Sequence, residues 1–474
     1  MFAASTSERR RQALALTITG AAVFMVTLDN LVVTNALPSI RADLGASISQ
    51  LGWFVNAYTL TFAALLLTGA SLGDRFGRRR IFALGLAIFT AGSLGAALAT
   101  SSDLLIGARS VQGLGAALVM PLSLTLLSTA FPPEKRGLAL GAWSGISGLA
   151  VALGPLVGGA VVEGISWHWI FWLNVPIGIV LAPLAHRRLA ESYGPGGRLD
   201  LGGLALAGLG MLGVVYGIVR GAELGWTSGT VLGSIGAGLI LLAGFVAWEL
   251  RARAPMLPMR FFRSRSFALA NGASFLMFFG MFGSIFLLAQ FFVSIQGYSP
   301  LQSGLRILPW TIAPMFIAPI AGSLSDRISP RLIIGTGLAL QAFALAWIGL
   351  VSTPTVPYSE LIAPFVLAGI GMGLFFAPIA NVVLSAVRPS EEGQASGANN
   401  AIRELGGVFG VAVLAAVFSH VGGYESAQAF SNGMNAAVLI GAGVVALGAV
   451  AAFAMPGRTR REPVEEAERL AEAA

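Results

Sequence analysis

The feature that most constrains this chain is a series of long apolar stretches, most of them separated by short polar loops. A helix that crosses the hydrocarbon core of a bilayer needs about 20 mostly apolar residues. We predict fourteen such helices. They cover residues 14–37, 51–73, 81–99, 104–128, 138–161, 169–186, 199–219, 229–250, 267–293, 301–323, 331–351, 359–385, 403–420 and 434–455. No soluble domain fits between them, so the sequence predicts an all-α polytopic membrane protein with the lipid bilayer as its partner.

The composition supports this prediction. Only 11% of the residues are charged, whereas soluble proteins carry about 25%. The 61 glycines suit spanning helices, whose backbones approach closely at small residues. A disordered chain is excluded because 55% of the residues are hydrophobic. Cysteine is absent and the three histidines lie far apart, so we predict neither disulfides nor a metal site.

The placement of basic residues predicts the orientation of the chain. If the N-terminus is cytoplasmic, 25 of the 29 basic residues lie at cytoplasmic ends or loops, and the others are Arg41, Arg109, Arg220 and Arg306. Lys and Arg are enriched in cytoplasmic loops, so both termini are predicted to be cytoplasmic. A nucleic-acid partner is not expected, because such proteins gather basic residues on one soluble face.

An internal repeat suggests two related halves. The loop GASLGDRFGRRRIF, which contains Asp74, matches the later loop AGSLSDRISPRLII, which contains Asp326. The match relates span 2 to span 10, an offset of eight, although two short basic loops can also be alike by chance. We therefore predict a six-helix bundle in 1–190, two inserted helices in 191–262, a second six-helix bundle in 263–456 and a cytosolic tail in 457–474. Two such bundles are a recurring transporter plan, with the substrate site near the midplane between them.

Several motifs resemble the major facilitator superfamily, specifically its fourteen-span drug:proton antiporters, over nearly the whole chain. They are the LGDRFGRRR loop, ARSVQGLGAA (Ala108–Ala117), GLAVALGPLVGG (Gly148–Gly159), LDNLVVTNALP (Leu28–Pro38), WHWIFWLNVPIG (Trp167–Gly178) and GYSPLQSG (Gly297–Gly304). The chain departs from the family pattern at Ala70, where glycine is expected, at Leu31 and Thr34, and at His168, where arginine is usual.

The resemblance implies roles for two groups of residues. The two matching loops would latch the bundles together in one transport state, through Asp74, Arg75, Gly77, Arg78, Asp326 and Arg327. The fifth span would carry the antiporter motif that the family associates with export, through Gly148, Gly154, Pro155, Gly158 and Gly159. From physics alone, basic loop residues also serve topology, and spaced glycines also serve ordinary helix packing.

Asp29 is the strongest single indication of mechanism. We interpret it as the only carboxylate well inside a predicted span, about 24 Å along the first helix at 1.5 Å per residue. An isolated carboxylate in hydrocarbon is costly and favours its neutral form, unless a cation or a donor stabilises the charge. Arg109 lies at a similar depth in the fourth predicted span and keeps its proton. We predict that these two residues carry proton coupling; a fixed structural ion pair is the alternative.

Other polar and aromatic residues within predicted spans are candidates to line a substrate cavity. They are Asn56, Tyr58, Gln112, Phe279, Phe286, Gln290 and Asn381. Aromatic and methionine surfaces suit varied apolar ligands. Each of these residues can equally serve helix packing or a helix–helix hydrogen bond.

Together these observations predict a monomeric, proton-coupled antiporter in a bacterial cell membrane that exports lipophilic neutral or monovalent cationic compounds. No GxxxxGK[ST] loop and no nucleophile with a base are visible, so neither ATP use nor an enzyme is predicted. No cofactor is expected beyond the proton gradient. The alternatives are a dedicated exporter of one metabolite or antibiotic, a solute:proton symporter, and, from another class, a non-transporting membrane scaffold or a lipid-modifying enzyme.

Overall fold

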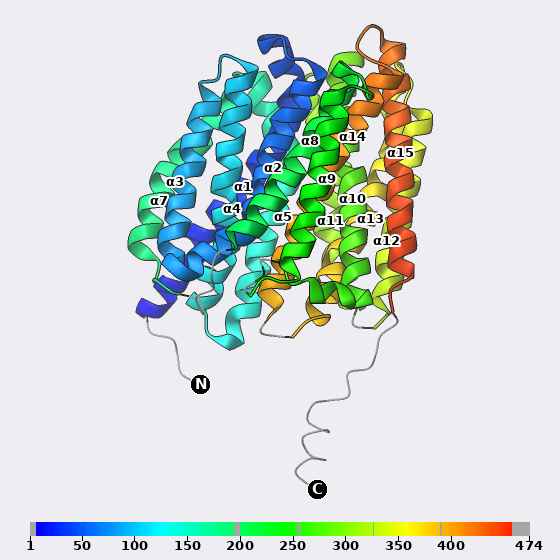
Figure 1. Ribbon diagram of the computed structural model, residues 1–474. Helices are drawn as coiled ribbons and strands as arrows, with labels where there is room; N and C mark the ends of the chain where they lie inside the picture. The colour runs from blue at the N-terminus through cyan, green and yellow to red at the C-terminus, as the bar shows by residue number, and fades with distance from the viewer. Residues whose placement is uncertain are drawn as a thin grey trace.

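The computed structural model describes residues 6–193, 200–253, 255, 257–325, 327–388 and 391–456, and all regular structure in these ranges is helical (Figure 1). The elements are α1 (Thr6–Leu44), α2 (Ile48–Phe76), α3 (Arg78–Ala97), α4 (Ser102–Ala130), α5 (Pro133–Gly164), α6 (Trp169–Trp172), α7 (Asn174–Arg188), α8 (Leu201–Leu224), α9 (Gly229–Glu249), the 3-10 helix η1 (Met259–Arg263), α10 (Arg265–Gln290), the π-helix η2 (Phe291–Ile295), α11 (Pro300–Ser325), α12 (Pro330–Val351), α13 (Tyr358–Ser385), α14 (Glu392–Val421) and α15 (Ala427–Phe453). The predicted tail, 457–474, lies outside the described residues.

Twelve of the described helices are long and apolar enough to cross a membrane. A thirteenth is counted if the two segments of α2, which meet at an angle of 50°, form one span. The predicted span 138–161 falls within α5, whose described apolar stretch is Leu153–Gly164. The structure therefore shows a multi-span all-helical protein, while the count of fourteen stays a prediction.

The helices form two groups that lie side by side (Figure 1). Helices α1–α7 pack mainly on one another, through pairs such as α3 with α4 and α1 with α5, and α10–α15 do the same. We call these groups the N-terminal half and the C-terminal half. Two helix pairs make most of the contact between the halves, α5 with α11 and α2 with α14, and we call the boundary they form the seam.

Helices α8 and α9 pack on each other, and α8 also packs on both α2 and α14. It therefore lies across the seam on the outside of the pair. A polar contact fixes the base of this hairpin, because Trp248 Nε1 donates to Asp200 Oδ1 at 2.7 Å. Asp200 also accepts the backbone N–H of Gly203 and so caps the start of α8.

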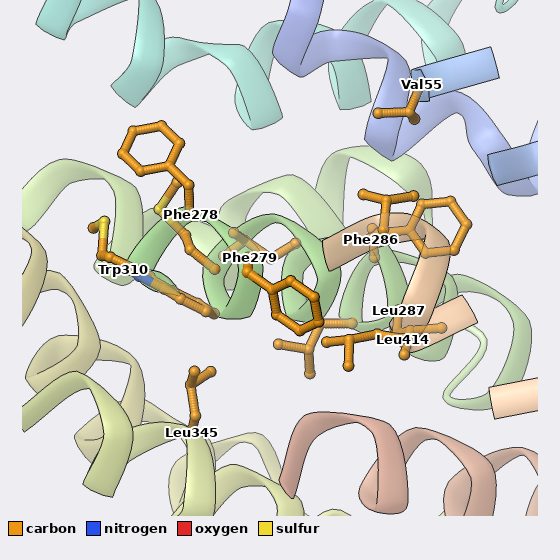
Figure 2. Close-up of a cluster of buried hydrophobic side chains, with 14 of the residues drawn as sticks. Val55, Phe278, Phe279, Phe286, Leu287, Trp310, Leu345 and Leu414 are labelled. Atoms are coloured by element: carbon orange, nitrogen blue, oxygen red, sulfur yellow. The ribbon is translucent and has the colours of Figure 1, made fainter. Parts of the chain in front are cut away.

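The core of the C-terminal half is built from large apolar side chains. Figure 2 shows Phe279 and Phe286 along α10, with Leu287 and Leu414 close together below Phe286, and Trp310 and Leu345 belong to the same buried cluster. Phe278 points away from Leu345 in the same view. Glycines set the helix spacing here, since a Cβ on Gly410 would lie 2.1 Å from the carbonyl oxygen of Phe279.

One predicted boundary is wrong in a way that affects function. The sequence predicts the thirteenth span at 403–420, but α14 begins at Glu392. Its first eleven residues, EGQASGANNAI, are too polar to register as part of a span, although they continue the helix. Arg403 and Glu404 consequently lie within the helix rather than at its cytoplasmic end, so Asp29 is not the only carboxylate inside a span.

Candidate functional site

The most deeply buried charges in the described structure form one ion pair between α1 and α4. Arg109 Nη1 lies 2.5 Å from Asp29 Oδ2, and both side chains are fully buried. Arg109 Nε also donates to the carbonyl oxygen of Phe54 on α2, at 3.1 Å. The guanidinium group therefore ties three helices of the N-terminal half together. The ion pair fits both roles considered for Asp29 and Arg109, and proton coupling stays a prediction.

Neutral amides complete the coordination of Asp29. Its Oδ1 accepts hydrogen bonds from Asn174 Nδ2 at 2.6 Å and Gln112 Nε2 at 3.0 Å. Gln112 in turn accepts from Arg109 Nη1, and Ser93 Oγ accepts from Gln112 at 2.8 Å and from Asn174 at 3.3 Å. We call these five residues the Asp29 cluster. A carboxylate with one guanidinium and two amide donors has its charge compensated despite its burial.

Aromatic rings cover the guanidinium group of Arg109. Its Cζ lies 4.3 Å from the centroid of the Tyr58 ring and 5.8 Å from that of Phe171. Cation–π contacts of this kind strengthen when the cation is desolvated. Tyr58 belongs to α2, which packs on α14 across the seam, so this ring stands between the Asp29 cluster and the C-terminal half.

Sequence reasoning missed two members of the cluster, Ser93 and Asn174. Asn174 is the first residue of α7, directly after the break that separates α6 from α7. It lies in the WHWIFWLNVPIG segment, and that resemblance was the one signal that pointed to it. Ser93 lies in a glycine-rich and alanine-rich helix, where the hydroxyl of a serine is expected to donate to a backbone carbonyl oxygen of its own helix.

The first of the two matching loops is held within its own half. Asp74 accepts a hydrogen bond from Arg78 Nε at 2.8 Å, and Gly77 between them has a φ of 103°, which favours glycine. Glu191, in the segment after α7, accepts the backbone N–H of Arg79 at 2.9 Å and so caps the start of α3. Sequence reasoning also missed Glu191.

The remaining latch residues are less constrained. The Arg75 guanidinium lies 5.2 Å from the ring of its neighbour Phe76. Arg327 is exposed after α11, and Asp326 lies outside the described residues.

The antiporter motif lies where α5 crosses α1 and α11. A Cβ on Gly154 would meet Leu31, and one on Gly158 would lie 2.8 Å from the Val32 carbonyl oxygen. On the seam, a Cβ on Gly159 would lie 2.3 Å from the Pro300 carbonyl oxygen. These three glycines are therefore required by close helix crossings.

Two other motif residues behave differently. The carbonyl oxygen of Pro155 accepts a hydrogen bond from Asn35 at 2.7 Å, and a Cβ on Gly304 of α11 would lie 2.1 Å from that same oxygen. By contrast, a Cβ on Gly148 would meet nothing within 4 Å. The structure gives no packing reason for glycine at that position.

The candidate lining residues are dispersed. Tyr58 and Gln112 belong to or adjoin the Asp29 cluster. Asn56 is fully buried, and neither atom of its amide has a partner. Asn381 is exposed and donates to Ser325 at 3.4 Å.

The other lining candidates lie on α10. Phe279 and Phe286 are buried in the hydrophobic core, so in this structure they serve helix packing (Figure 2). Gln290 donates to the Phe286 carbonyl oxygen at 2.9 Å and accepts from the Tyr424 hydroxyl near the end of the molecule that is predicted to lie outside.

Comparisons with known proteins place the chain in a family. A sequence profile of the Major Facilitator Superfamily matches residues 19–411 and 270–473. The chain belongs to the Major Facilitator Superfamily, whose members are transporters rather than enzymes. The resemblance drawn from the motifs is thereby confirmed.

Several bacterial relatives carry names related to drug resistance or export. The multidrug resistance protein Stp of Mycobacterium tuberculosis (strain CDC 1551 / Oshkosh) is 35% identical over 86% of this chain and 76% of that protein. The cephamycin export protein CmcT of Amycolatopsis lactamdurans is 38% identical over 87% of this chain and 86% of that protein. The methylenomycin A resistance protein of Streptomyces coelicolor is 35% identical over 86% of each.

Solved structures share the fold. A bacterial homologue of the human lysosomal transporter Spinster, in an inward-facing and unoccupied conformation, aligns with a TM-score of 0.67 at 19% identity, over 94% of this chain and 96% of that chain. An auto-inhibited POT family peptide transporter aligns with a TM-score of 0.70 at 16% identity, over 96% and 98%. At these identities the likeness concerns the fold alone.

Proposed function

We propose that the protein is a proton-coupled antiporter that exports lipophilic, neutral or monovalent cationic compounds by alternating access. The observation that carries this proposal is the Asp29 cluster, a carboxylate buried between spanning helices beside a residue that contacts the seam. Intramembrane carboxylates with a named partner are functional groups by default. Loss of the Arg109 contact in another conformation would leave this carboxylate without its cation between spanning helices, and groups of this kind mark proton pathways.

In this proposal the chain has fourteen spans, with α8 and α9 inserted between two six-helix bundles. Both termini lie on the cytoplasmic side of a bacterial cell membrane, and the protein acts as a monomer. The two bundles rock about the seam, as in other transporters built from repeats.

Contacts at the predicted outer end indicate which side this conformation closes. The Glu163 carboxylate, at the end of α5, accepts hydrogen bonds from the Ser299 hydroxyl at 2.5 Å and from the Leu301 backbone N–H at 3.2 Å. The Arg41 guanidinium lies 3.4 Å from the centroid of the Tyr424 ring. Both contacts join the two halves, so the proposed substrate path would be closed at this end in this conformation.

Tyr424 is a neutral component of this closure. Burial raises the pKa of its hydroxyl, and the nearby Arg41 guanidinium acts in the opposite direction. The hydroxyl therefore remains protonated at physiological pH. This agrees with its role as the donor to Gln290.

A second candidate function is the dedicated export of one metabolite or antibiotic. The relatives favour it, because one is named for cephamycin export and another for methylenomycin A resistance. The fold and the ion pair suit either function, since substrate range depends on the cavity lining rather than on the energy source.

The test is efflux of ethidium, a lipophilic monovalent cation, from cells that express the wild type, Asp29→Asn or the control Asp103→Asn. Asp103 is an exposed carboxylate at the start of α4, so the control makes the same chemical change without a buried partner. We expect efflux by the wild type and the control and none by Asp29→Asn, and the protonophore should abolish efflux by the wild type and the control.

Efflux that survives the protonophore would contradict proton coupling. Efflux that is unchanged in Asp29→Asn would remove Asp29 from the mechanism. A well-expressed wild type that moves no ethidium would favour the dedicated exporter.

A further inference from the structure

A second pair of charges lies within the spans of the C-terminal half, and the proposed mechanism does not use it. Arg403 and Glu404 are consecutive residues inside α14, and both are half-buried. Charged residues within spans are rare and costly, and they mark substrate or ion pathways. The question is what these two side chains bind.

Glu404 faces the N-terminal half. Its helix neighbours Ala401 and Val408, three residues before and four residues after it, pack on residues of α2 across the seam. Residues at these spacings share a helix face. In agreement with this placement, Ala401 belongs to the same buried cluster as Tyr58 of α2.

Arg403 faces the aromatic side chains of its own half. Its Cζ lies 4.4 Å from the ring centroid of Phe278 on α10 and 5.0 Å from that of Phe376 on α13. Phe278 in turn stacks on Phe282, with ring centroids 5.6 Å apart. The rings of Phe282 and Phe376 are only half-buried, so this aromatic layer has accessible surface beside the guanidinium group.

The two charged groups do not neutralise each other through a hydrogen bond. Glu404 Oε2 and Arg403 Nε are both shielded from solvent, and neither has a hydrogen-bond partner in the described part of the chain. Among the residues that the structure describes, the guanidinium makes one hydrogen bond, from Nη1 to Asn400 Oδ1 at 3.3 Å, within a single turn. Buried polar groups without partners are exceptional and call for a ligand or a functional role.

The net charge of these buried groups determines the net charge that a ligand can carry. In the conformation described, in which Asp29 is paired with Arg109, the Asp29 cluster and the Arg403–Glu404 pair each contain one carboxylate and one guanidinium, so together they have no net charge. A ligand with net charge would enter a region of low dielectric without compensation, which is costly. A ligand with no net charge but with one positive and one negative group can satisfy both Glu404 and Arg403.

We propose that Arg403 and Glu404 form a substrate site for amphipathic zwitterions. The cationic group of the substrate binds Glu404 beside Tyr58, its carboxylate binds Arg403, and its apolar body rests against Phe282 and Phe376. This inference rests on the proposed export function and narrows its substrate class.

The test uses two dyes that differ by one charge. Tetramethylrhodamine carries a cationic xanthene and a free carboxylate, and its methyl ester is the corresponding cation. Uptake of each dye into proteoliposomes with an acidic lumen gives kcat/KM for the wild type, Arg403→Gln, Glu404→Gln and the control Arg253→Gln, whose side chain is exposed in the segment after α9.

We expect the wild type and the control to prefer the zwitterion by about tenfold or more, the value of one charge-assisted hydrogen bond. Arg403→Gln should reverse the preference, because the site then has a net negative charge. Glu404→Gln should lower transport of both dyes by a similar factor. Reversal of selectivity is a result that a purely structural role of Arg403 would not produce.

Equal transport of the two dyes by the wild type, or preference for the ester, would overturn the zwitterion site and leave the export function standing. This comparison needs only the wild type, so it holds even where a variant fails to fold. Absence of gradient-driven uptake of either dye would overturn the proposed export function and this inference with it.

Discussion

At the scale of single residues, the Asp29 cluster combines one charged donor and two neutral donors around a buried carboxylate. Three side chains donate to Asp29, and only one of them is charged. Removal of one partner from a buried pair costs about 3–5 kcal/mol, so Arg109 is strictly required. The two amides add hydrogen bonds that stabilise the Asp29 carboxylate without changing the net charge of the cluster.

The contribution of Asn174 can be measured directly. Because Asn174→Ala removes a 2.6 Å hydrogen bond to a buried carboxylate, we expect it to lower the free energy of unfolding by about 1–3 kcal/mol. Thermal unfolding in detergent checks this, with Asn381→Ala as a control on an exposed amide. In an Asp29→Asn background the effect of Asn174→Ala should shrink markedly; an unchanged effect would show that Asn174 does not act through Asp29.

The sequence predicts the charged residues of the Asp29 cluster but not all of its neutral ones. Asp29 and Arg109 were predictable because charged residues in apolar helices are rare, and their positions along the helices gave similar depths. Asn174 and Ser93 were not, because neutral polar residues occur in most of the helices. Glu404 was missed for another reason: a hydropathy argument detects apolar segments, and the first turns of α14 are polar.

At the scale of helices, the crossing of α5 with α11 depends on the absence of side chains. Gly159 and Gly304 each approach a carbonyl oxygen of the opposite helix, from Pro300 and Pro155 respectively. This crossing lies near the Glu163–Ser299 contact at the predicted outer end. A methyl group there must separate the two halves, since carbonyl oxygens of the backbone cannot move independently of their helices.

Gly159→Ala is therefore expected to open the outer end. A spin label on each half, at Ala42→Cys and Glu425→Cys, reports the separation, and the absence of native cysteine makes the labelling specific. We expect the distance distribution to shift to longer values and transport to fall about tenfold or more, as for other misplacements at a functional contact. Gly148→Ala, in the same helix but without neighbours, should change neither; a shift in both variants would contradict the argument.

Helix α3 depends on a capping residue from a distant segment. Glu191 accepts the N–H of Arg79 and lies 3.4 Å from the Arg79 Nε. Loss of a cap costs about 0.5–2 kcal/mol, so Glu191→Ala should lower the free energy of unfolding within that range. Thermal unfolding of Glu191→Ala measures this contribution, with Glu425→Ala, which removes an exposed loop carboxylate, as the control. Equal stability of the two variants would mean that the cap contributes nothing.

At the scale of the whole molecule, the fold was predictable further than the site. Apolar length and basic loops predict helices and their order, and the repeat of the Asp-Arg loop suggested two halves. What the sequence did not contain is how the halves meet. The seam is made by glycines and by half-polar helices such as α14, whose role depends on partners far apart in the chain.

The position of α8 and α9 provides the decisive test of the predicted topology. Two inserted helices leave the orientation of the C-terminal half unchanged whether both cross the membrane or neither does. Thr100 and Thr353, in the α3–α4 and α12–α13 loops, are therefore expected outside in both cases. Only the α8–α9 loop distinguishes them, and Thr227 is exposed there.

Single cysteines at these three positions, treated with an impermeant maleimide on intact cells, should all be labelled if the chain has fourteen spans. Arg253→Cys, in the segment after α9, should react only after permeabilisation. Labelling at Thr100 and Thr353 without labelling at Thr227 would mean that α8 and α9 do not cross the bilayer. That result is disfavoured physically, because α9 is the less buried of the two and its apolar surface, including Leu239 and Ile240, would then face water at a cost of about 25 cal/mol for each Å².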